Sequence, residues 1–481
     1  MFPCVMMMFH LMFASGVDYQ CPYGECECFR ARIMCDNLGM EELPPLLTTQ
    51  PTVNTYLSAD NNAISHIRAG TIPAGLVEIS LVNNPIVSID DTAFALSSTT
   101  LEIISITNAR FTRIPDAFRN LTALKYFTLS GLQIQDWNSD VMKVIGATIE
   151  MMSLGPVGLT SWPSWFQFFT SLTEVTISGN AIASIPEDAF DQIYNRLTSF
   201  GIINSSLTEL PKALSKLSVL ETLIVQVSDL SELAWLPSFG KLTTLRLEDA
   251  HLSSAGNLSN ALKVVADSVD FVGLQGNRLT TIPELSFMTT LSAVDFMHNR
   301  ISDTLSGSFP PGVETVDLSY NLLPAIPRPI YNLKSLAYLT IPWNYVTGLT
   351  GTEIPTSTTQ ADFGHNLISE LTDSSFPENS SIIYLTLSYN PIVKISSSAF
   401  QNLLHLGSLL MTNTNINRLP VSLAPLKTLY YFDISGSQNL VCTCEEVSLR
   451  PLFLRLESMK GNCGQIDIYY FYTSLSVACP T

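Results

Sequence analysis

Apolar residues recur along this chain in one pattern, L-x-x-L-x-L-x-x-N-x-L, in which Ile or Val often replaces Leu. The spacing of two between the fourth and sixth positions is typical of a β-strand with one buried face, and a period of about 20 to 29 residues indicates a solenoid of stacked repeats. Clear copies of the pattern are Leu76-Ile79-Leu81-Asn84-Ile86, Leu172-Val175-Ile177-Asn180-Ile182, Val313-Val316-Leu318-Asn321-Leu323 and Ile382-Leu385-Leu387-Asn390-Ile392.

Alignment on this pattern divides most of the chain into about 17 repeats of 22 to 27 residues. We expect positions 4 and 6 of each repeat to point into the core, and positions 3, 5 and 7 to point outward from a shared sheet. The pattern therefore predicts an α/β horseshoe solenoid with a long parallel concave sheet and a mostly irregular convex side. The repeats begin near residues 54, 76, 101, 124, 149, 172, 197, 220, 242, 269, 291, 313, 336, 358, 382, 406 and 429.

Asn stands at position 9 in nine repeats, where the chain turns away from the strand and an amide can bond backbone groups left unpaired. The other eight repeats lack it, so we expect much of the 100–250 region to be less regular. Pairs such as Ile114-Pro115 and Ile326-Pro327 follow the turn and limit helix formation on the convex side. The nine are Asn62, Asn84, Asn180, Asn277, Asn299, Asn321, Asn344, Asn366 and Asn390.

The charge balance restricts the choice of partners. Only 14% of the 481 residues are charged, and the net charge is −18. Binding to phosphate requires clustered Lys and Arg, so we expect neither nucleic acid nor anionic membrane surfaces as partners. No stretch after residue 20 has the 18 or more apolar residues of a membrane span, and the chain stops two residues after Cys479, without room for a lipid-anchor signal. We therefore expect no membrane insertion.

The first residues resemble a signal peptide. A short apolar run from Met1 to about Ala14 leads into Ala14-Ser15-Gly16, whose small side chains suit cleavage near Val17. The run contains no Lys or Arg, and a buried N-terminal strand or helix is the alternative interpretation. We expect residues 1–16 to be a signal peptide and the protein to be secreted, to the extracellular space or matrix.

Cysteines fall into two clusters of four at opposite ends of the chain, once Cys4 leaves with the signal peptide. An even, clustered count in a secreted chain predicts disulfides. Structural zinc is the alternative, but neither cluster contains His, and C-x-C spacing fits zinc less well than C-x2-C does. Each cluster allows three pairings. The clusters are Cys21, Cys26, Cys28 and Cys35, and Cys442, Cys444, Cys463 and Cys479.

Repeats flanked by two cysteine clusters resemble the extracellular leucine-rich-repeat family, in which cysteine-rich caps cover the open ends of the solenoid. The resemblance implies an N-terminal cap at 17–53, repeats at 54–440 and a C-terminal cap at 441–481. It says less about function, because the family includes matrix proteins, axon-guidance ligands, neurotrophic and immune receptors, and non-catalytic partners of secreted enzymes. Family caps usually pair the first cysteine with the third and the second with the fourth, which implies Cys21–Cys28, Cys26–Cys35, Cys442–Cys463 and Cys444–Cys479.

Catalytic motifs are absent from the sequence. It contains no H-E-x-x-H, P-loop, G-x-G-x-x-G or G-x-S-x-G, and its histidines fall on different repeats, so we expect no enzyme activity, metal or cofactor. Asp295 and Asp317 occupy position 5 of adjacent repeats and should lie about 5 Å apart, as in a retaining glycosidase or half a calcium site. We favour the simpler interpretation, that Asp is ordinary at this position of the family's repeat.

Aromatic and acidic residues concentrate in repeats eleven to fifteen, which begin near residues 291 to 382. Tyr and Trp bury a large area at low entropic cost, so this stripe is a candidate binding surface. The alternative is that the aromatic rings merely stack along the solenoid. Position 8 holds Gly276, His298, Tyr320, Trp343, His365 and Tyr389, position 5 holds Asp295, Asp317 and Asp362, and position 3 holds Tyr338 and Tyr384.

Four N-x-[ST] sequons, at Asn120, Asn204, Asn257 and Asn379, are candidate glycosylation sites. Asn204 is expected near the concave rim, where a glycan would direct partners toward the later repeats. The sequence as a whole predicts a secreted module that binds an extracellular or cell-surface protein on its concave face. A structural matrix component and a non-catalytic subunit of a secreted enzyme are the alternatives; a receptor ectodomain would need a membrane segment.

Overall fold

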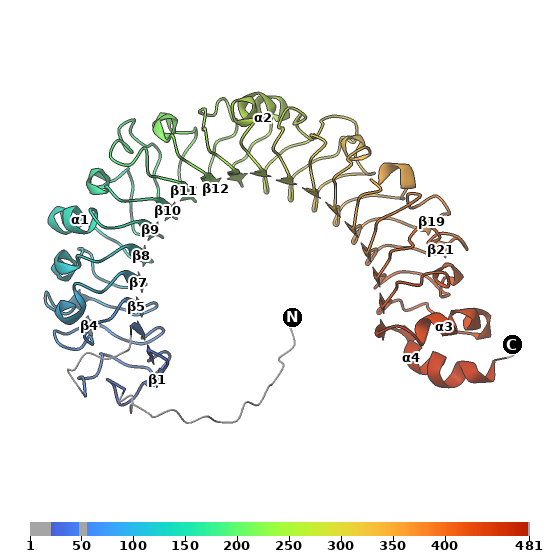
Figure 1. Cartoon of the computed structure of the whole chain (residues 1–481), viewed down its shortest axis with the longest axis horizontal. Helices are drawn as coiled ribbons and strands as arrows, with labels where there is room; N and C mark the ends of the chain where they lie inside the picture. Colours follow the sequence, from blue (N-terminus) through green and yellow to red (C-terminus); the bar gives the residue numbers. More distant parts are fainter. Residues whose placement is uncertain (1–20, 48–54, 480–481) are drawn as a thin grey trace. The chain divides into compact units, whose positions relative to one another are not determined.

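The computed structural model describes residues 21–47 and 55–479, so the expected signal peptide lies outside the described residues. The chain divides into two compact units. The first contains the chain up to Leu159 together with Pro163–Ile177, and the second contains Thr160–Trp162 and the chain from Ser178 onward. Within each unit, the sheet strands lie on the inner side of the curved ribbon and the helices on the outer side (Figure 1).

The first unit is built on a sheet that is parallel apart from its first strand. β1 (Glu27–Phe29) pairs antiparallel with β2 (Arg32–Met34), and every later pair is parallel. The strands that follow are β3 (Tyr56–Ser58), β5 (Glu78–Leu81), β7 (Ile103–Thr107), β8 (Tyr126–Ser130), β9 (Met151–Leu154) and β10 (Glu174–Ser178).

The second unit continues the same architecture with parallel strands. They are β11 (Ser199–Ile203), β12 (Thr222–Gln226), β13 (Thr244–Glu248), β14 (Phe271–Gly273), β15 (Ala293–Asp295), β16 (Thr315–Asp317), β17 (Tyr338–Thr340), β18 (Gln360–Asp362), β20 (Tyr384–Thr386), β22 (Ser408–Leu410), β23 (Tyr431–Asp433) and β24 (Ser458–Lys460).

The connections between strands are mostly irregular, as the sequence predicts. Two of the α-helices, α1 (Ser139–Ile145) and α2 (Ala255–Leu262), lie among the repeats, and α3 (Arg450–Phe453) and α4 (Ile468–Tyr470) lie near the C-terminus. Short strands form two parallel pairs, β4 (His66–Ile67) with β6 (Ser88–Ile89) and β19 (Glu370–Leu371) with β21 (Lys394–Ile395). β25 (Asn462–Cys463) and β26 (Ile466–Asp467) form an antiparallel pair.

Several 3₁₀ helices begin directly after a proline. The proline ring fixes φ at about −65°, which suits the extended conformation that this residue adopts before each helix. These are η2 (Asp116–Asn120), η3 (Ser164–Phe168), η4 (Lys212–Lys216), η6 (Arg328–Ile330) and η8 (Val421–Leu423). The others are η1 (Ala95–Ser97), η5 (Lys263–Val265), η7 (Gly351–Glu353), η9 (Cys444–Leu449) and η11 (Ser476–Ala478), and η10 (Phe471–Leu475) is a short π-helix.

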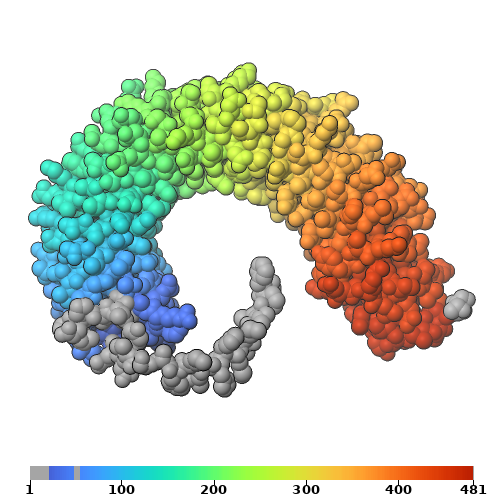
Figure 2. Space-filling model, in the orientation of Figure 1, coloured from blue at the N-terminus to red at the C-terminus, as the bar shows by residue number. Residues whose placement is uncertain are grey.

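The repeat pattern places the strands correctly. Each predicted repeat carries a sheet strand that starts two residues after the predicted beginning, and positions 4 and 6 are buried, as at Val294 and Phe296. Side chains fill the spaces between successive repeats of each unit (Figure 2). The parallel α/β solenoid is therefore confirmed. Parallel pairing also extends to β2 and β24, so the number of repeats depends on where the caps begin, and seventeen remains a prediction.

The expectation of lower regularity between residues 100 and 250 is wrong for the sheet. Strands β7 to β13 contain four or five residues each, whereas the strands from β14 to β24 that belong to the same sheet contain three. Parallel pairing uses only backbone N–H and C=O groups and needs apolar residues at positions 4 and 6, which these repeats keep, as at Leu223 and Val225. The repeats that lack the position 9 Asn therefore keep their strand pairing.

The position 9 asparagines bridge consecutive repeats. Asn321 is 4% exposed; its Nδ2 donates to Phe296 O at 3.0 Å, and its Oδ1 accepts from Ile301 N at 2.9 Å. Asn299, Asn344, Asn366 and Asn390 repeat these contacts. Each amide satisfies buried backbone groups of the preceding repeat that the turn would leave unpaired.

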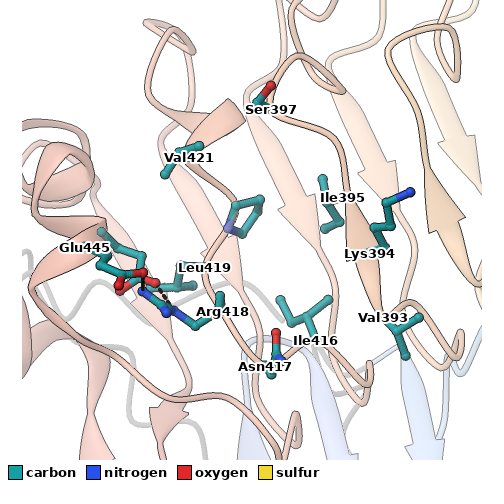
Figure 3. A pocket seen from close by; sticks show the side chains of 12 residues that line it. Val393, Lys394, Ile395, Ser397, Ile416, Asn417, Arg418, Leu419, Val421 and Glu445 are labelled. Atoms are coloured by element: carbon teal, nitrogen blue, oxygen red, sulfur yellow. Dashed lines mark hydrogen bonds and ion pairs between the residues drawn. The ribbon is translucent and has the colours of Figure 1, made fainter.

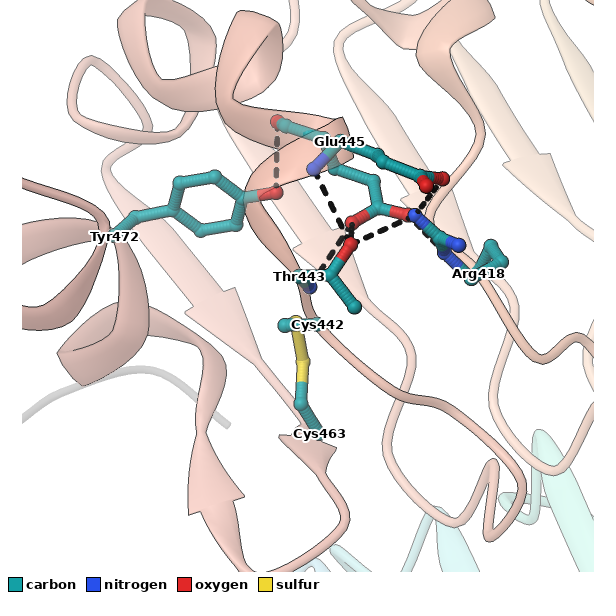
Figure 4. Close-up of polar contacts among 7 residues, drawn as sticks. Arg418, Cys442, Thr443, Glu445, Cys463 and Tyr472 are labelled. Carbon is teal, nitrogen blue, oxygen red and sulfur yellow. Dashed lines mark hydrogen bonds and ion pairs between the residues drawn. A yellow bond between two sulfur atoms is a disulfide. The ribbon is translucent and has the colours of Figure 1, made fainter. Parts of the chain in front are cut away.

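Disulfides close both ends of the described chain, in the pairs that the family resemblance implies: Cys21–Cys28, Cys26–Cys35, Cys442–Cys463 and Cys444–Cys479. At the C-terminal end, Thr443 and Glu446 form a capping box at the start of η9, and the Tyr472 hydroxyl donates to Glu446 O at 3.2 Å (Figure 4). Arg418 joins this cluster to the preceding repeat through Glu446, Glu445 and Thr443.

Candidate recognition surface

Position 8 of the repeat has a left-handed backbone in almost every repeat. Its φ lies between +48° and +76°, and Pro156 is the exception among the predicted repeats. Gly, Asn and Asp tolerate this conformation best, and most early repeats use them, as at Asn61, Asn83 and Asn108. The hydrophobic pattern does not predict this conformation, although the recurrence of Asn and Gly at one position is a usable signal for it.

Five consecutive repeats place large rings at this strained position. His298, Tyr320, Trp343, His365 and Tyr389 have φ values from 50° to 58°, and we call them the aromatic ladder. A left-handed conformation costs a bulky L-residue about 1–2 kcal/mol relative to the right-handed one. Something in the folded or bound protein must offset this cost at five successive positions.

Stacking between the rings of the aromatic ladder provides part of the offset. The centroid distances along the ladder are 4.2, 5.3, 3.7 and 4.0 Å, and the interplanar angles are 23°, 9°, 9° and 11°. An aromatic pair of this kind contributes about 0.5–1.5 kcal/mol beyond its buried area. The structural alternative that the sequence left open, stacking along the solenoid, is therefore present.

The stacked rings nevertheless remain open to solvent. Tyr320, Trp343 and Tyr389 are 39%, 47% and 50% exposed. Their faces contact one another, so the exposed parts are mainly ring edges. Stacking and recognition are compatible here, because a stack with fixed ring orientations presents a large aromatic surface with little entropy left to lose.

The predicted carboxylates lie beside the aromatic ladder at position 5. Asp295 and Asp317 are directly opposite each other on β15 and β16, and Asp362 stands two strands further on. Each Oδ1 accepts a hydrogen bond from the backbone N–H two residues later: Met297 at 2.7 Å, Ser319 at 2.8 Å and Gly364 at 2.8 Å. Part of the role of these aspartates is thus to fix the turn that leads to position 8.

The local environment disfavours the charged forms of two of these carboxylates. Burial, followed by the charges of Asp317 and Glu248, raises the pKa of Asp295, although its bond from Met297 acts in the opposite direction. Burial also raises the pKa of Asp362, and the charge of Asp317 adds to this effect. Burial within the stack lowers the pKa of His365, against the attraction of Asp362.

Tyr338 and Tyr384 occupy position 3 of their repeats, where they begin β17 and β20, and each is 44% exposed on the same face of the sheet. The Tyr384 side chain shares a hydrogen bond with Tyr430, and this bond is the main cause that raises the pKa of Tyr430. Gly407 makes room for the Tyr430 ring, because a Cβ there would lie 2.6 Å from it. All ten predicted binding residues therefore lie on consecutive repeats of the second unit, in β15, β16, β17, β18 and β20 or the turns that follow.

The structure also contains a groove that the sequence pattern does not predict. It has a volume of about 410 Å³ and lies between β21, the segment 416–421 and the C-terminal cap (Figure 3). Lys394, Arg418 and Glu445 line it, and Arg418 and Glu445 form an ion pair with a distance of 2.6 Å. None of the predicted binding residues takes part in this groove.

In the part of the chain that the structure describes, no three His, Cys, Asp or Glu side chains come together in a way that could hold a metal ion. None of the helices in residues 21–47 and 55–479 has the length and apolar character needed to cross a bilayer. The four sequon residues, Asn120, Asn204, Asn257 and Asn379, are all exposed, which keeps them available as candidate glycosylation sites.

Solved structures share the architecture. A crystal structure of a TLR13–ssRNA13 complex matches with a TM-score of 0.53 and 17% identity, covering 87% of this chain and 74% of that chain. The mouse RP105/MD-1 complex matches with a TM-score of 0.54 and 15% identity, covering 91% of this chain and 96% of that chain. At such identities the likeness shows the fold alone, a leucine-rich-repeat solenoid.

Sequence comparison agrees with this class. Opticin of Bos taurus is 32% identical over 129 residues, 22% of this chain and 39% of opticin. Toll-like receptor 3 of Boselaphus tragocamelus is 23% identical over 241 residues, 48% of this chain and 24% of the receptor. The matched regions thus span less than half the length of these curated relatives, and no family model matches the chain. The chain therefore has a leucine-rich-repeat fold, is similar in sequence to leucine-rich-repeat proteins, and carries disulfides near both ends of its described residues.

Proposed function

We propose that this protein is an extracellular recognition module that binds a protein partner on the sheet face of its second unit, around the aromatic ladder. The observation that carries the proposal is the ladder itself: five stacked rings, of which Tyr320, Trp343 and Tyr389 are exposed, at a backbone position that favours Gly or Asn. Residues that violate local conformational preferences concentrate at functional sites.

The disulfides at both ends favour an oxidising, extracellular compartment. Related leucine-rich-repeat chains occur in complexes with a protein, as RP105 does with MD-1, and with RNA, as TLR13 does with ssRNA13. For this chain a protein is the better candidate, because the face around the ladder carries carboxylates and the chain's net charge is −18. Secretion, glycosylation at the four sequons and the absence of catalysis form part of the same proposal.

The test is affinity capture from native extracellular fluid with three proteins. The first is the wild type, the second carries Tyr320→Ala, Trp343→Ala and Tyr389→Ala, and the third is a matched control with Leu96→Ala, Tyr194→Ala and Val264→Ala. The control residues are 47%, 48% and 48% exposed on connecting segments. Circular dichroism and thermal unfolding would verify that all three proteins fold.

We expect a partner that the wild type and the control retain and the ladder variant loses. Hot-spot aromatics contribute about 2 kcal/mol or more each, so the loss should exceed tenfold in affinity. Equal recovery by all three proteins would contradict the assignment of this face as the binding site. Loss from both variants would also contradict it, since the effect would then not be specific to the ladder.

A further inference from the structure

Charge is distributed unevenly over the sheet face that surrounds the aromatic ladder. Between β14 and β22, positions 3 to 8 of each repeat contain three aspartates, Asp295, Asp317 and Asp362, and no Lys or Arg. The nearest basic side chain on the sheet, Arg246 on β13, already pairs with Glu248 at 2.9 Å. Apart from the two histidines of the ladder, the ionisable side chains with charge at neutral pH on this face are therefore all acidic.

Each of the three carboxylates keeps one oxygen available. The Oδ1 atoms accept the backbone bonds described above, whereas the Oδ2 atoms make no hydrogen bond to any residue that the structure describes. All three side chains are half-buried, and each lies within electrostatic range of another. Each Oδ2 atom can therefore accept a charge-assisted hydrogen bond from a donor on a partner.

Two exposed tyrosine rings lie next to the strands that carry Asp317 and Asp362, an arrangement that suits a planar cationic donor. Tyr338 on β17 lies between the strand of Asp317 and the strand of Asp362, and Tyr384 on β20 pairs beside β18. Tyr at position 3 and Asp at position 5 of a neighbouring strand are diagonal neighbours on one face, about 7–8 Å apart. A planar cation could lie on the ring and still reach the carboxylate.

We propose that the partner presents arginine side chains to this face, and that their guanidinium groups stack on Tyr338 and Tyr384 and donate to the Oδ2 atoms of Asp317 and Asp362. This inference rests on the proposed recognition function and specifies the chemistry of the partner. Arginine fits better than lysine, because its planar group stacks on aromatic faces and donates in a fork that matches a carboxylate. Asp295 extends the negative field toward the start of the aromatic ladder.

The test measures the binding of a fluorescently labelled hexa-arginine peptide, with hexa-lysine and hexa-glutamate as comparison peptides, at fixed ionic strength. The site variant carries Asp295→Asn, Asp317→Asn and Asp362→Asn. The charge-matched control carries Asp91→Asn, Asp188→Asn and Glu209→Gln, three exposed residues outside this face. Both variants change the net charge equally, so a difference between them reports on the site. Asn keeps the Oδ1 acceptor, so the site variant should fold, and thermal unfolding would verify this.

We expect the site variant to bind hexa-arginine at least tenfold more weakly than the wild type, with the control within about twofold of the wild type. We also expect hexa-lysine to bind more weakly than hexa-arginine, and hexa-glutamate not to bind. Equal binding of hexa-arginine to all three proteins would overturn the inference, as would equal binding of the two basic peptides.

The native partner separates the two proposals. If its capture depends on the aromatic ladder but is unchanged by the three Asp→Asn substitutions, the arginine inference fails and the recognition function stands. If its capture does not depend on the ladder, the proposed recognition site itself fails.

Discussion

Trp343 shows how two local energies compete at a single residue. Its φ of 58° opposes a bulky side chain, whereas its ring stacks on Tyr320 and His365 with centroids 5.3 and 3.7 Å away. Asn fits the same backbone in other repeats, as at Asn413 with φ 53°. Comparing Trp with Asn and Ala therefore separates the stacking energy from the conformational cost.

Substituting Trp343 should reveal this competition in thermal and urea unfolding. Trp343→Ala loses both stacking contacts and keeps the left-handed backbone, so we expect a destabilisation of about 1–3 kcal/mol. Trp343→Asn loses the same contacts but tolerates the conformation, so it should be more stable than the Ala variant by about 0.5–1 kcal/mol. An Ala variant as stable as the Asn variant would show that the backbone at position 8 is not strained.

At Asp295 the competition is between a hydrogen bond that favours the folded state and a partly buried charge that opposes folding at neutral pH. Folding raises the pKa of this carboxyl, so its contribution to stability is fully present below the ordinary pKa near 4, where the carboxyl is protonated. This contribution is lost as the pH rises through the raised pKa of the folded state. Asp295→Asn keeps the acceptor for Met297 N–H and removes the charge. We expect its melting temperature to exceed that of the wild type at pH 7, by on the order of 1 °C, and to equal it near pH 3. A lower melting temperature at pH 7 would show that the charge stabilises the fold.

At the scale of repeats and strands, the sequence predicted the strand positions, which depend on burial, and did not predict the left-handed turn, which depends on backbone conformation. Strand positions followed from the apolar residues at positions 4 and 6, because a strand with one buried face has a fixed period of two. The strand lengths between residues 100 and 250 did not follow, since backbone pairing there is independent of the missing Asn. The left-handed turn was missed because hydrophobicity at position 8 says nothing about φ, and only the recurrence of Asn and Gly could have revealed it.

Asn321 tests how far a position 9 side chain holds two repeats together. Asn321→Ala leaves Ile301 N–H and Phe296 C=O buried without this partner, and each lost group costs about 1–3 kcal/mol. Asn321→Ser should lose less, because a serine hydroxyl at position 9 can accept a hydrogen bond from a backbone N–H of the preceding repeat, as Ser437 Oγ does from Thr414 N–H. Hydrogen exchange at Ile301 should accelerate most in the Ala variant. Equal protection in both variants would argue against a specific role for the amide.

At the scale of the whole molecule, a chain of repeats is stabilised by contacts between neighbours, so its ends decide where unfolding begins. The sequence alone indicated the cysteines that form the two C-terminal disulfides, because their clustering is visible there. It could not locate the ion pair that joins the C-terminal cap to the repeats, since Arg418 and Glu446 belong to no pattern. Glu446 is 3% exposed, and Arg418 donates to it through Nε and to Thr443 Oγ1 through Nη2 at 2.8 Å.

Removing Arg418 should detach the C-terminal cap first. Arg418→Met leaves the Glu446 carboxylate buried beside a neutral group. Breaking a fully buried ion pair costs about 3–5 kcal/mol, and we expect a smaller loss of stability here because Arg418 is partly exposed. We expect faster hydrogen exchange in β23, β24 and α3, with β14 to β16 unchanged, and partial recovery when Glu446→Gln is added. Lys394→Met is the control, because its pair with Glu370 is exposed and should contribute less than about 1 kcal/mol. Uniform loss of protection along the second unit would show that this unit unfolds as a whole and that Arg418 does not specifically anchor the cap.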